Sequence, residues 1–169
     1  MWNDTDTPLA YLICFRTYGT WLHGDIRGAI DRFHNRYGAP YLDPNEVWHH
    51  HNRKQLKVQP FILRARERGS VENSIRETCS IRKWDLHAIN VRTNHVHAVV
   101  TADSRANLVL NAFKANATRQ LRADKLWLHP FTPWADKGSK IFLWTEQSVV
   151  NAIDYVLNGQ GDDLPKILI

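Results

Sequence analysis

Apolar positions recur along the chain with two different periods, which predict strands and helices. Short runs rich in β-branched and aromatic residues predict strands at Leu9–Arg16, Leu86–Val91, His95–Thr101 and Lys140–Trp144. Apolar residues three or four positions apart predict helices at Arg64–Lys83, Arg105–Ala123 and about 145–158. In the second of these helices the pattern places these residues on the inward face: Leu108, Ala112, Ala115 and Leu121.

Turn and capping residues separate the expected elements. Arg92-Thr93-Asn94 lies between two strands and predicts an antiparallel hairpin. Thr145 is a suitable N-cap for the last helix, and Gly159 is a suitable end for it.

The order of these elements is strand, helix, strand, strand, helix, strand and a final helix. That order is typical of the split βαβ pattern of a ferredoxin-like α+β sandwich, in which an antiparallel four-stranded sheet carries helices on one face. Here one more C-terminal helix is added. Between about residues 24 and 60 the periodicity fails, so we expect a long, partly ordered insertion within one domain spanning 1–169.

Composition narrows the class of protein. The 169 residues are 43% hydrophobic and include seven tryptophans, which favours a globular protein over a disordered one. The formal charge of +5 is compatible with a polyanionic partner. No apolar run approaches the length of a membrane span, and Cys14 and Cys79 lack paired spacing, so we expect free thiols in a reducing cytoplasm and no membrane partner.

The segment Asn94-His-Val-His97 carries the first candidate chemistry. Side chains alternate along a strand, so the apolar Val96, Ala98 and Val100 face the helices while His95 and His97 share the opposite face. Two imidazoles on one face can converge on a divalent ion. A His-x-His pair alone is also compatible with an ordinary strand surface.

The last helix carries the second candidate. Its core stripe is Val149, Ile153 and Val156, and Tyr155 lies well away from the centre of that stripe. A phenol with an ordinary pKa near 10 is a poor nucleophile unless a base or a metal-polarised phosphate assists it. Tyr155 is therefore a candidate nucleophile only in the company of a metal site.

Together these features resemble the HUH nucleases, and in particular the single-tyrosine transposases of small insertion sequences and REP-associated elements. The resemblance is carried by His95-Val-His97, the order of elements, and Tyr155-Val-Leu-Asn158. It implies cleavage and rejoining of single-stranded DNA, usually at hairpin-forming ends, by a nucleoid-associated enzyme. Tyr155 would form a 5′-phosphotyrosine, and His95 and His97 would hold Mg²⁺ or Mn²⁺.

The resemblance also implies a third, polar metal ligand about one turn beyond the tyrosine, where this chain has Gly159. Asn158 and Gln160 both stay open as that ligand, with Gln160 favoured if the helix kinks at Gly159. Family members act as monomers or as dimers, so a homodimer is one expected assembly.

Further residues are candidates for DNA contacts. Basic residues are expected to meet phosphates, with Lys114 favoured, and aromatic residues after the first strand could stack on bases or cover the core. The candidates are Arg16, Arg92, Lys114, Arg119, Arg122, Lys140, Tyr18 and Trp21.

Several other features have simpler interpretations. His49-His50-His51 is expected to be solvated, Glu146 and Asp154 to be solvated or to cap, and Trp127, Trp134 and Trp144 to pack. Two rival functions remain: a domesticated module that binds DNA or RNA hairpins without cutting, and a zinc-stabilised domain. The second is disfavoured because a structural zinc site needs four ligands, usually including cysteines.

Overall fold

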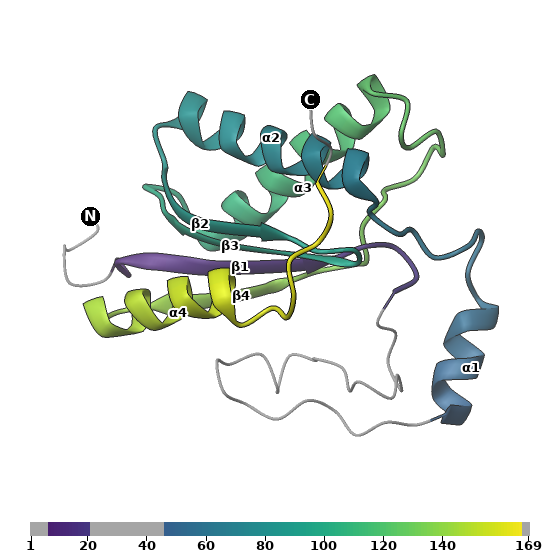
Figure 1. Ribbon diagram of the computed structural model, residues 1–169, viewed down its shortest axis with the longest axis horizontal. Coiled ribbons are helices and arrows are strands. Elements are labelled where there is room, and N and C mark those ends of the chain that lie inside the picture. The colour runs from purple at the N-terminus through teal and green to yellow at the C-terminus, as the bar shows by residue number, and fades with distance from the viewer. Residues whose placement is uncertain (1–6, 21–45, 167–169) are drawn as a thin grey trace.

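A four-stranded antiparallel sheet forms the centre of the molecule (Figure 1). The computed structural model describes residues 7–20 and 46–166. The strands are β1 (Ala10–Arg16), β2 (Asp85–Val91), β3 (His95–Thr101) and β4 (Ser139–Leu143), in the order β2-β3-β1-β4. This is the ferredoxin-like order, so the expected fold class is confirmed.

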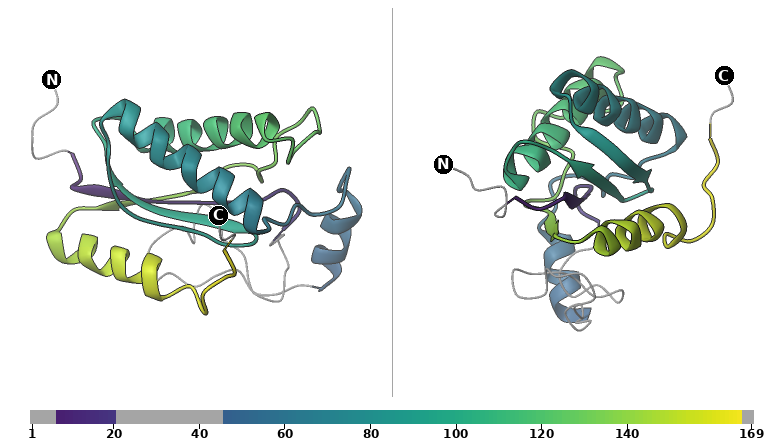
Figure 2. Two further views of the ribbon diagram at one scale, coloured as in Figure 1. Left: turned by 45° about the horizontal axis from the view of Figure 1, so that its top comes forward. Right: turned by 90° about the vertical axis from the view of Figure 1, so that its left-hand side faces the viewer.

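Helices cover both faces of the sheet (Figures 1 and 2). On one face lie α2 (Ala65–Arg82) and α3 (Ala106–Ala123), and on the other lies α4 (Glu146–Asn158). A further helix, α1 (Glu46–Lys54), falls within the expected insertion, of which residues 24–45 lie outside the described part of the chain.

The alternation of β3 explains the two cores. Val96, Ala98 and Val100 join the larger core under α2 and α3, where Phe113 is fully enclosed. Val99 faces the other way and joins a smaller core with Ala152 and Val156 of α4. Since His97 is two residues from Val99, the same alternation turns both histidines toward the α4 side.

The inward face of α3 differs from the expected one. Leu108 is 56% exposed and Ala115 is exposed, whereas Ala112 and Leu121 are buried as expected. Phe113 is the largest buried side chain of this helix, and burying an aromatic ring of this size removes more apolar area from water than burying Ala115 would. The helix is therefore turned to place Phe113 against Trp84, with ring centroids 6.1 Å apart.

The expected packing of the tryptophans holds for two of the three. Trp127 and Trp134 are 4% and 1% exposed, and the Trp134 indole donates to the Lys114 carbonyl. Trp144 is 51% exposed and contacts Phe142; it directly follows β4, which is an edge strand of the sheet.

No helix in the described ranges is both long and apolar enough to cross a membrane.

Candidate active site

The register of the central strands places the site at one end of the sheet. In β1 and β3, Arg16 pairs with His95 and Cys14 pairs with His97. On the other side of β3, Asn90 pairs with His97, and its amide donates to the Val156 carbonyl of α4 at 2.9 Å. Asn90 thereby ties the tyrosine helix to the strand beside the histidines.

The two histidines and the tyrosine come together within one chain. The ring centroids of His95 and His97 are 4.7 Å apart, and those of His97 and Tyr155 are 5.5 Å apart. His97 is only 8% exposed, whereas His95 and Tyr155 are half-buried. His95, His97 and Tyr155, which come from two distant segments of the sequence, therefore lie close together on one side of the sheet.

Capping and termination of α4 set the position of Tyr155. Thr145 and Ser148 form a reciprocal capping box at the start of the helix, as the sequence predicts. At the other end the Gly159 N–H donates to the Tyr155 carbonyl. A side chain at residue 159 would begin 2.8 Å from that carbonyl oxygen and 3.0 Å from the tyrosine ring, so glycine permits the close turn.

That turn brings Gln160, and not Asn158, to the histidines. The Gln160 amide nitrogen donates to the Tyr155 carbonyl at 3.1 Å, which directs its oxygen toward His95 Nε2 at 3.3 Å. Asn158 is exposed and donates to Asp154 instead. The chain departs from a simple helix at Gly159, and this is why spacing alone left both residues open.

The contacts of His95 fit a divalent ion. Its Nδ1 lies 2.6 Å from the Asn94 side-chain oxygen, so Nδ1 can carry the ring proton and leave the Nε2 lone pair facing the Gln160 oxygen. Neighbouring ligands about 2.1 Å from one octahedral ion are about 3.0 Å apart, which is close to the 3.3 Å between His95 Nε2 and the Gln160 oxygen. Imidazole nitrogens and an amide oxygen form a set suited to such an ion.

His97 is held in the neutral form that metal binding requires. Burial first, and then the charges of His95 and Arg92, lower the pKa of His97 to about 3, with the Gln160 amide opposing them in part. His97 Nδ1 lies 2.7 Å from Cys14 Sγ. Burial raises the pKa of the Cys14 thiol far above its usual range, so the sulfur stays protonated. The expectation of free thiols agrees with both described cysteines.

The expected DNA-contact residues are dispersed. Arg16 lies opposite His95, and Arg92 lies in the adjoining hairpin turn. Lys114 is half-buried and donates to the carbonyls of Ala135 and Lys137, so it braces the loop before β4 and does not face the histidines. Burial and the nearby Lys140 lower the pKa of Lys114, while Asp136 opposes this shift.

The side chains of Tyr18 and Arg122 contact neighbouring loop segments. The Tyr18 hydroxyl accepts from the Lys57 N–H, and its ring packs 5.2 Å from Phe131. Arg119 is exposed on α3, and Arg122 donates to the carbonyls of His129 and Phe131. Trp21 lies outside the described residues.

The other candidate chemistry is also separate from the pair. His50 and His51 are exposed on α1, and no group of three His, Cys, Asp or Glu side chains within 7–20 and 46–166 could hold a metal. Glu146 lies in the first turn of α4, where its carboxylate interacts favourably with the positive end of the helix dipole. Asn90 and Cys14 are site residues that sequence reasoning missed, because only the strand register brings them to His97.

The chain belongs to the family described as IS200-like transposases, whose model matches residues 45–153. The matched segment includes both histidines and ends before Tyr155 and Gln160. No curated protein matches the chain in a sequence comparison.

Two solved structures are similar to this fold. The first is assigned as a transposase of Deinococcus radiodurans; it is 12% identical, has a TM-score of 0.51, and the alignment covers 96% of this chain and 98% of that one. The second is a REP-associated tyrosine transposase bound to a REP hairpin, at 10% identity and a TM-score of 0.48, covering 89% of this chain and 65% of that one. At this identity the first likeness concerns the fold alone.

Proposed function

We propose that this chain is a metal-dependent single-stranded DNA endonuclease and strand transferase that acts through a 5′-phosphotyrosine at Tyr155. Membership of a transposase family supports a DNA substrate and a strand-transfer reaction. The observation that carries the finer proposal is the convergence of Tyr155, His97, His95 and Gln160 at one end of the sheet. The resemblance to HUH transposases favours hairpin-forming DNA ends as the substrate.

The proposed reaction needs no external energy source, because the phosphodiester bond that breaks is replaced by a phosphotyrosine bond. Tyr155 Oη loses its proton and forms a bond to the scissile phosphorus, while the bond from phosphorus to the 3′ oxygen breaks. The departing 3′ oxygen takes up a proton, and the 5′ phosphate remains on the tyrosine. A 3′-hydroxyl from another strand then reverses these steps and releases the phenol.

The residues around Tyr155 have distinct roles in this proposal. His95, His97 and Gln160 would hold Mg²⁺ or Mn²⁺, which when bound polarises the phosphate oxygens and stabilises the developing charge. The low pKa of His97 keeps its imidazole available as a ligand across the physiological range. Asn90 and Gly159 would fix the end of α4 and so keep the phenol beside the proposed metal ligands.

A suicide oligonucleotide tests the nucleophile. The oligonucleotide carries a hairpin with a single-stranded extension on its 5′ side. Cleavage in the extension releases a short upstream piece that bears the 3′-hydroxyl and diffuses away, so the covalent adduct of Tyr155 with the downstream 5′ phosphate accumulates with Mn²⁺. The Tyr155→Phe variant should lose the adduct, seen as a shifted band on a denaturing gel. Tyr18→Phe is the matched control, because it removes a hydroxyl engaged by the Lys57 backbone and should keep the adduct.

A second variant tests the metal ligands. His97→Ala should abolish the adduct while binding of the strand, followed by fluorescence anisotropy, stays within about threefold, because phosphate contacts elsewhere supply most of the affinity. Retention of the adduct by Tyr155→Phe would refute the nucleophile. Hairpin binding by a wild-type protein that forms no adduct in any divalent metal would instead support the non-cleaving module.

A further inference from the structure

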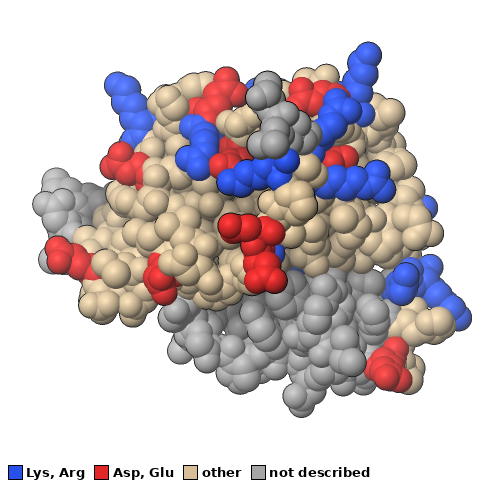
Figure 3. Space-filling model, in the orientation of Figure 1, with Lys and Arg blue, Asp and Glu red and all other residues tan. Residues whose placement is uncertain are grey.

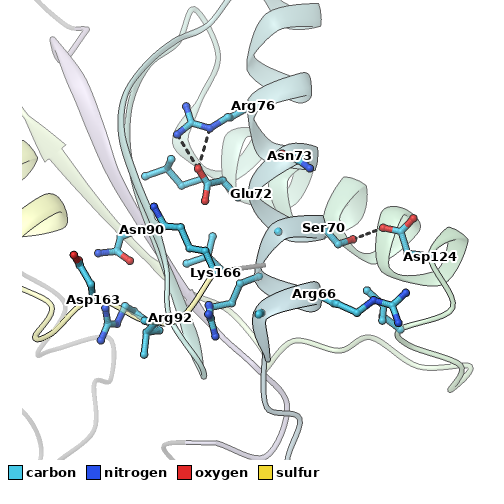
Figure 4. A pocket seen from close by; sticks show the side chains of 17 residues that line it. Arg66, Ser70, Glu72, Asn73, Arg76, Asn90, Arg92, Asp124, Asp163 and Lys166 are labelled. Atoms are coloured by element: carbon cyan, nitrogen blue, oxygen red, sulfur yellow. Dashed lines mark hydrogen bonds and ion pairs between the residues drawn. The ribbon is translucent and has the colours of Figure 1, made fainter. Parts of the chain in front are cut away.

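A cavity of about 700 Å³ lies between the N-terminal half of α2, the end of β2 and the residues that follow α4; we call it the basic groove (Figure 4). Its cationic lining residues are Arg66, Arg68, Arg76, Arg92 and Lys166. In the space-filling view, Lys and Arg side chains gather over α2 on this face of the molecule (Figure 3).

The charges in the basic groove do not cancel. Its carboxylates are Glu72, Asp124 and Asp163. Glu72 is paired with Arg76 at 2.8 Å, so these two charges largely neutralise one another. Asp124 accepts from Ser70, and this bond is the main cause of its lowered pKa. Four cations therefore face two further carboxylates, and the groove keeps a positive balance.

Two of these arginines are held in place by neutral oxygens. Arg92 donates to the Asp162 carbonyl at 3.0 Å. Arg68 donates to the Pro165 carbonyl and, at 3.4 Å, to the Leu63 carbonyl. A backbone carbonyl orients a guanidinium without neutralising its charge, and a guanidinium has five donors, so both side chains can also bind an anion.

The first turn of α2 adds to the positive potential. Ala65 and Arg66 of this turn line the groove, and the N-cap, Arg64, makes no side-chain hydrogen bond to the helix. The N–H groups at the start of the helix therefore add partial positive charge at this end of the groove.

The lining selects for one form of nucleic acid. No aromatic side chain belongs to the described lining, which apart from charged groups consists of aliphatic residues and the small polar Ser70, Asn73 and Asn90. Single strands are usually held by aromatic side chains on which bases stack, whereas a duplex backbone is held by cations, amides and hydroxyls. The groove therefore suits a sugar–phosphate backbone whose bases are already paired.

We propose that the basic groove binds the phosphate backbone of a base-paired DNA stem, whose single-stranded extension then enters the site of His95, His97 and Tyr155. The inference rests on the proposed function and adds to it a location for the duplex part of the substrate. Arg92 connects the two regions, because it lines the groove and its N–H donates to the His95 carbonyl in the hairpin turn. The junction between paired and unpaired DNA would thus lie at Arg92.

Other basic side chains are less suited to this role. Lys114 and Arg122 each donate to two backbone carbonyls of the loop between α3 and β4, and neither lines the basic groove.

Charge reversal in the groove tests the proposal. The doubly substituted Arg66→Glu, Arg68→Glu protein is titrated with a fluorescent hairpin that has a single-stranded extension, and with the extension alone. Affinity for the hairpin should fall about tenfold or more at 0.1 M salt, and the slope of log K against log[salt] should decrease by roughly one for each lost phosphate contact. Affinity for the extension alone, and the Tyr155 adduct on it, should change by less than about twofold.

Two further variants complete the design. Arg82→Glu is the matched control, since Arg82 lies sixteen positions after Arg66 on the same helix, about 24 Å away, and should leave hairpin binding unchanged. Arg66→Glu alone retains the carbonyl contacts of Arg68 and should show part of the loss if the double variant is unstable.

The outcomes separate this inference from the proposed function. Unchanged hairpin affinity in the folded groove variants, or an equal loss in Arg82→Glu or with the extension alone, would overturn the stem-binding role. A wild-type protein that forms no adduct but loses hairpin affinity through the groove substitutions would keep this inference and reject the nuclease.

Discussion

Cys14 acts at the residue scale through its contact with His97. For His97 Nε2 to bind a metal, Nδ1 must carry the ring proton and donate it to a partner. The Cys14 sulfur lies 2.7 Å from Nδ1, and in this tautomer the protonated thiol would accept the Nδ1 proton through a sulfur lone pair. Such partners orient the ring and fix its tautomer, so in the proposed metal site the thiol would contribute to metal binding without touching the metal.

Removing this acceptor should weaken the metal site. In Cys14→Ala the dissociation constant for Mn²⁺, measured by electron paramagnetic resonance of the free ion, should rise by about tenfold. Cys14→Ser offers an oxygen to Nδ1 and should restore most of the affinity. Nitrogen-detected NMR of the metal-free proteins should show His97 changing its tautomer in the alanine variant only.

Cys79→Ala is the control for this prediction, because Cys79 is buried in the larger core and its loss lowers stability without reaching His97. Equal Mn²⁺ affinity in wild type and Cys14→Ala, with an unchanged His97 tautomer, would contradict the role given to the thiol.

Sequence reasoning proposed His95, His97 and Tyr155 from local periods, and the fold brings these three side chains close together. It missed Cys14 and Asn90, because they reach His97 through pairing between strands far apart in the chain. It favoured Lys114 for a DNA contact, which stays a prediction, and it did not foresee that the Lys114 ammonium donates to carbonyls of the loop before β4.

At the scale of elements, the C-terminal end of α4 determines where Tyr155 and Gln160 lie. Gly159 lies between these two residues, and a Cβ atom at this position would meet both the carbonyl oxygen and the ring of Tyr155. The site therefore depends on the absence of one methyl group.

Gly159→Ala should displace the end of α4. Its Cβ would lie 2.8 Å from the Tyr155 carbonyl oxygen, so the turn must open and carry Gln160 away from His95. We expect at least a tenfold slower formation of the tyrosine adduct, measured under single-turnover conditions, because misplacement by about 1 Å can cost a hundredfold in rate.

Gly69→Ala is the matched control, since nothing lies within 4 Å of the added methyl group in the interior of α2. It should raise the free energy of unfolding by about 0.5–1 kcal/mol. Because Gly69 lines the basic groove, the rate is compared on the single-stranded extension alone, where it should be unchanged. Equal rates for Gly159→Ala and wild type would show that the turn has room to adjust.

The elements themselves were largely predictable from the sequence. Each expected strand and helix is present within one residue of its predicted ends among the described residues, because period, caps and turns agreed. The buried face of α3 was not predictable, because burying Phe113 in the larger core removes more apolar area from water than burying the expected stripe would. The basic groove was not either, because α2, β2 and the residues after α4 meet only in the folded chain.

At the scale of the whole molecule, the tyrosine faces the histidines of its own chain. The 5.5 Å between the His97 and Tyr155 ring centroids needs no second copy to complete the site. The sequence alone was compatible with either arrangement, because nothing in a helix's pattern tells which copy of the sheet it will cover.

Mixing two inactive variants tests this arrangement. Equimolar Tyr155→Phe and His97→Ala should form no more adduct together than separately, since neither chain holds both groups. Recovery of about a quarter or more of the wild-type adduct would mean that one chain supplies its tyrosine to another. Each variant mixed with wild type controls for inhibition, and should reduce the adduct only by dilution.

The unequal cores have a consequence for turnover. The smaller core holds α4 with only Ala152 and Val156 fully buried, whereas α3 buries seven residues. The free energy of local opening increases with buried apolar area, so detaching α4 from the sheet requires less free energy than detaching α3. In the proposed reaction α4 would then move together with the DNA bonded to Tyr155, so that one DNA end can leave and another can enter. The sheet and the larger core would keep their positions during this exchange.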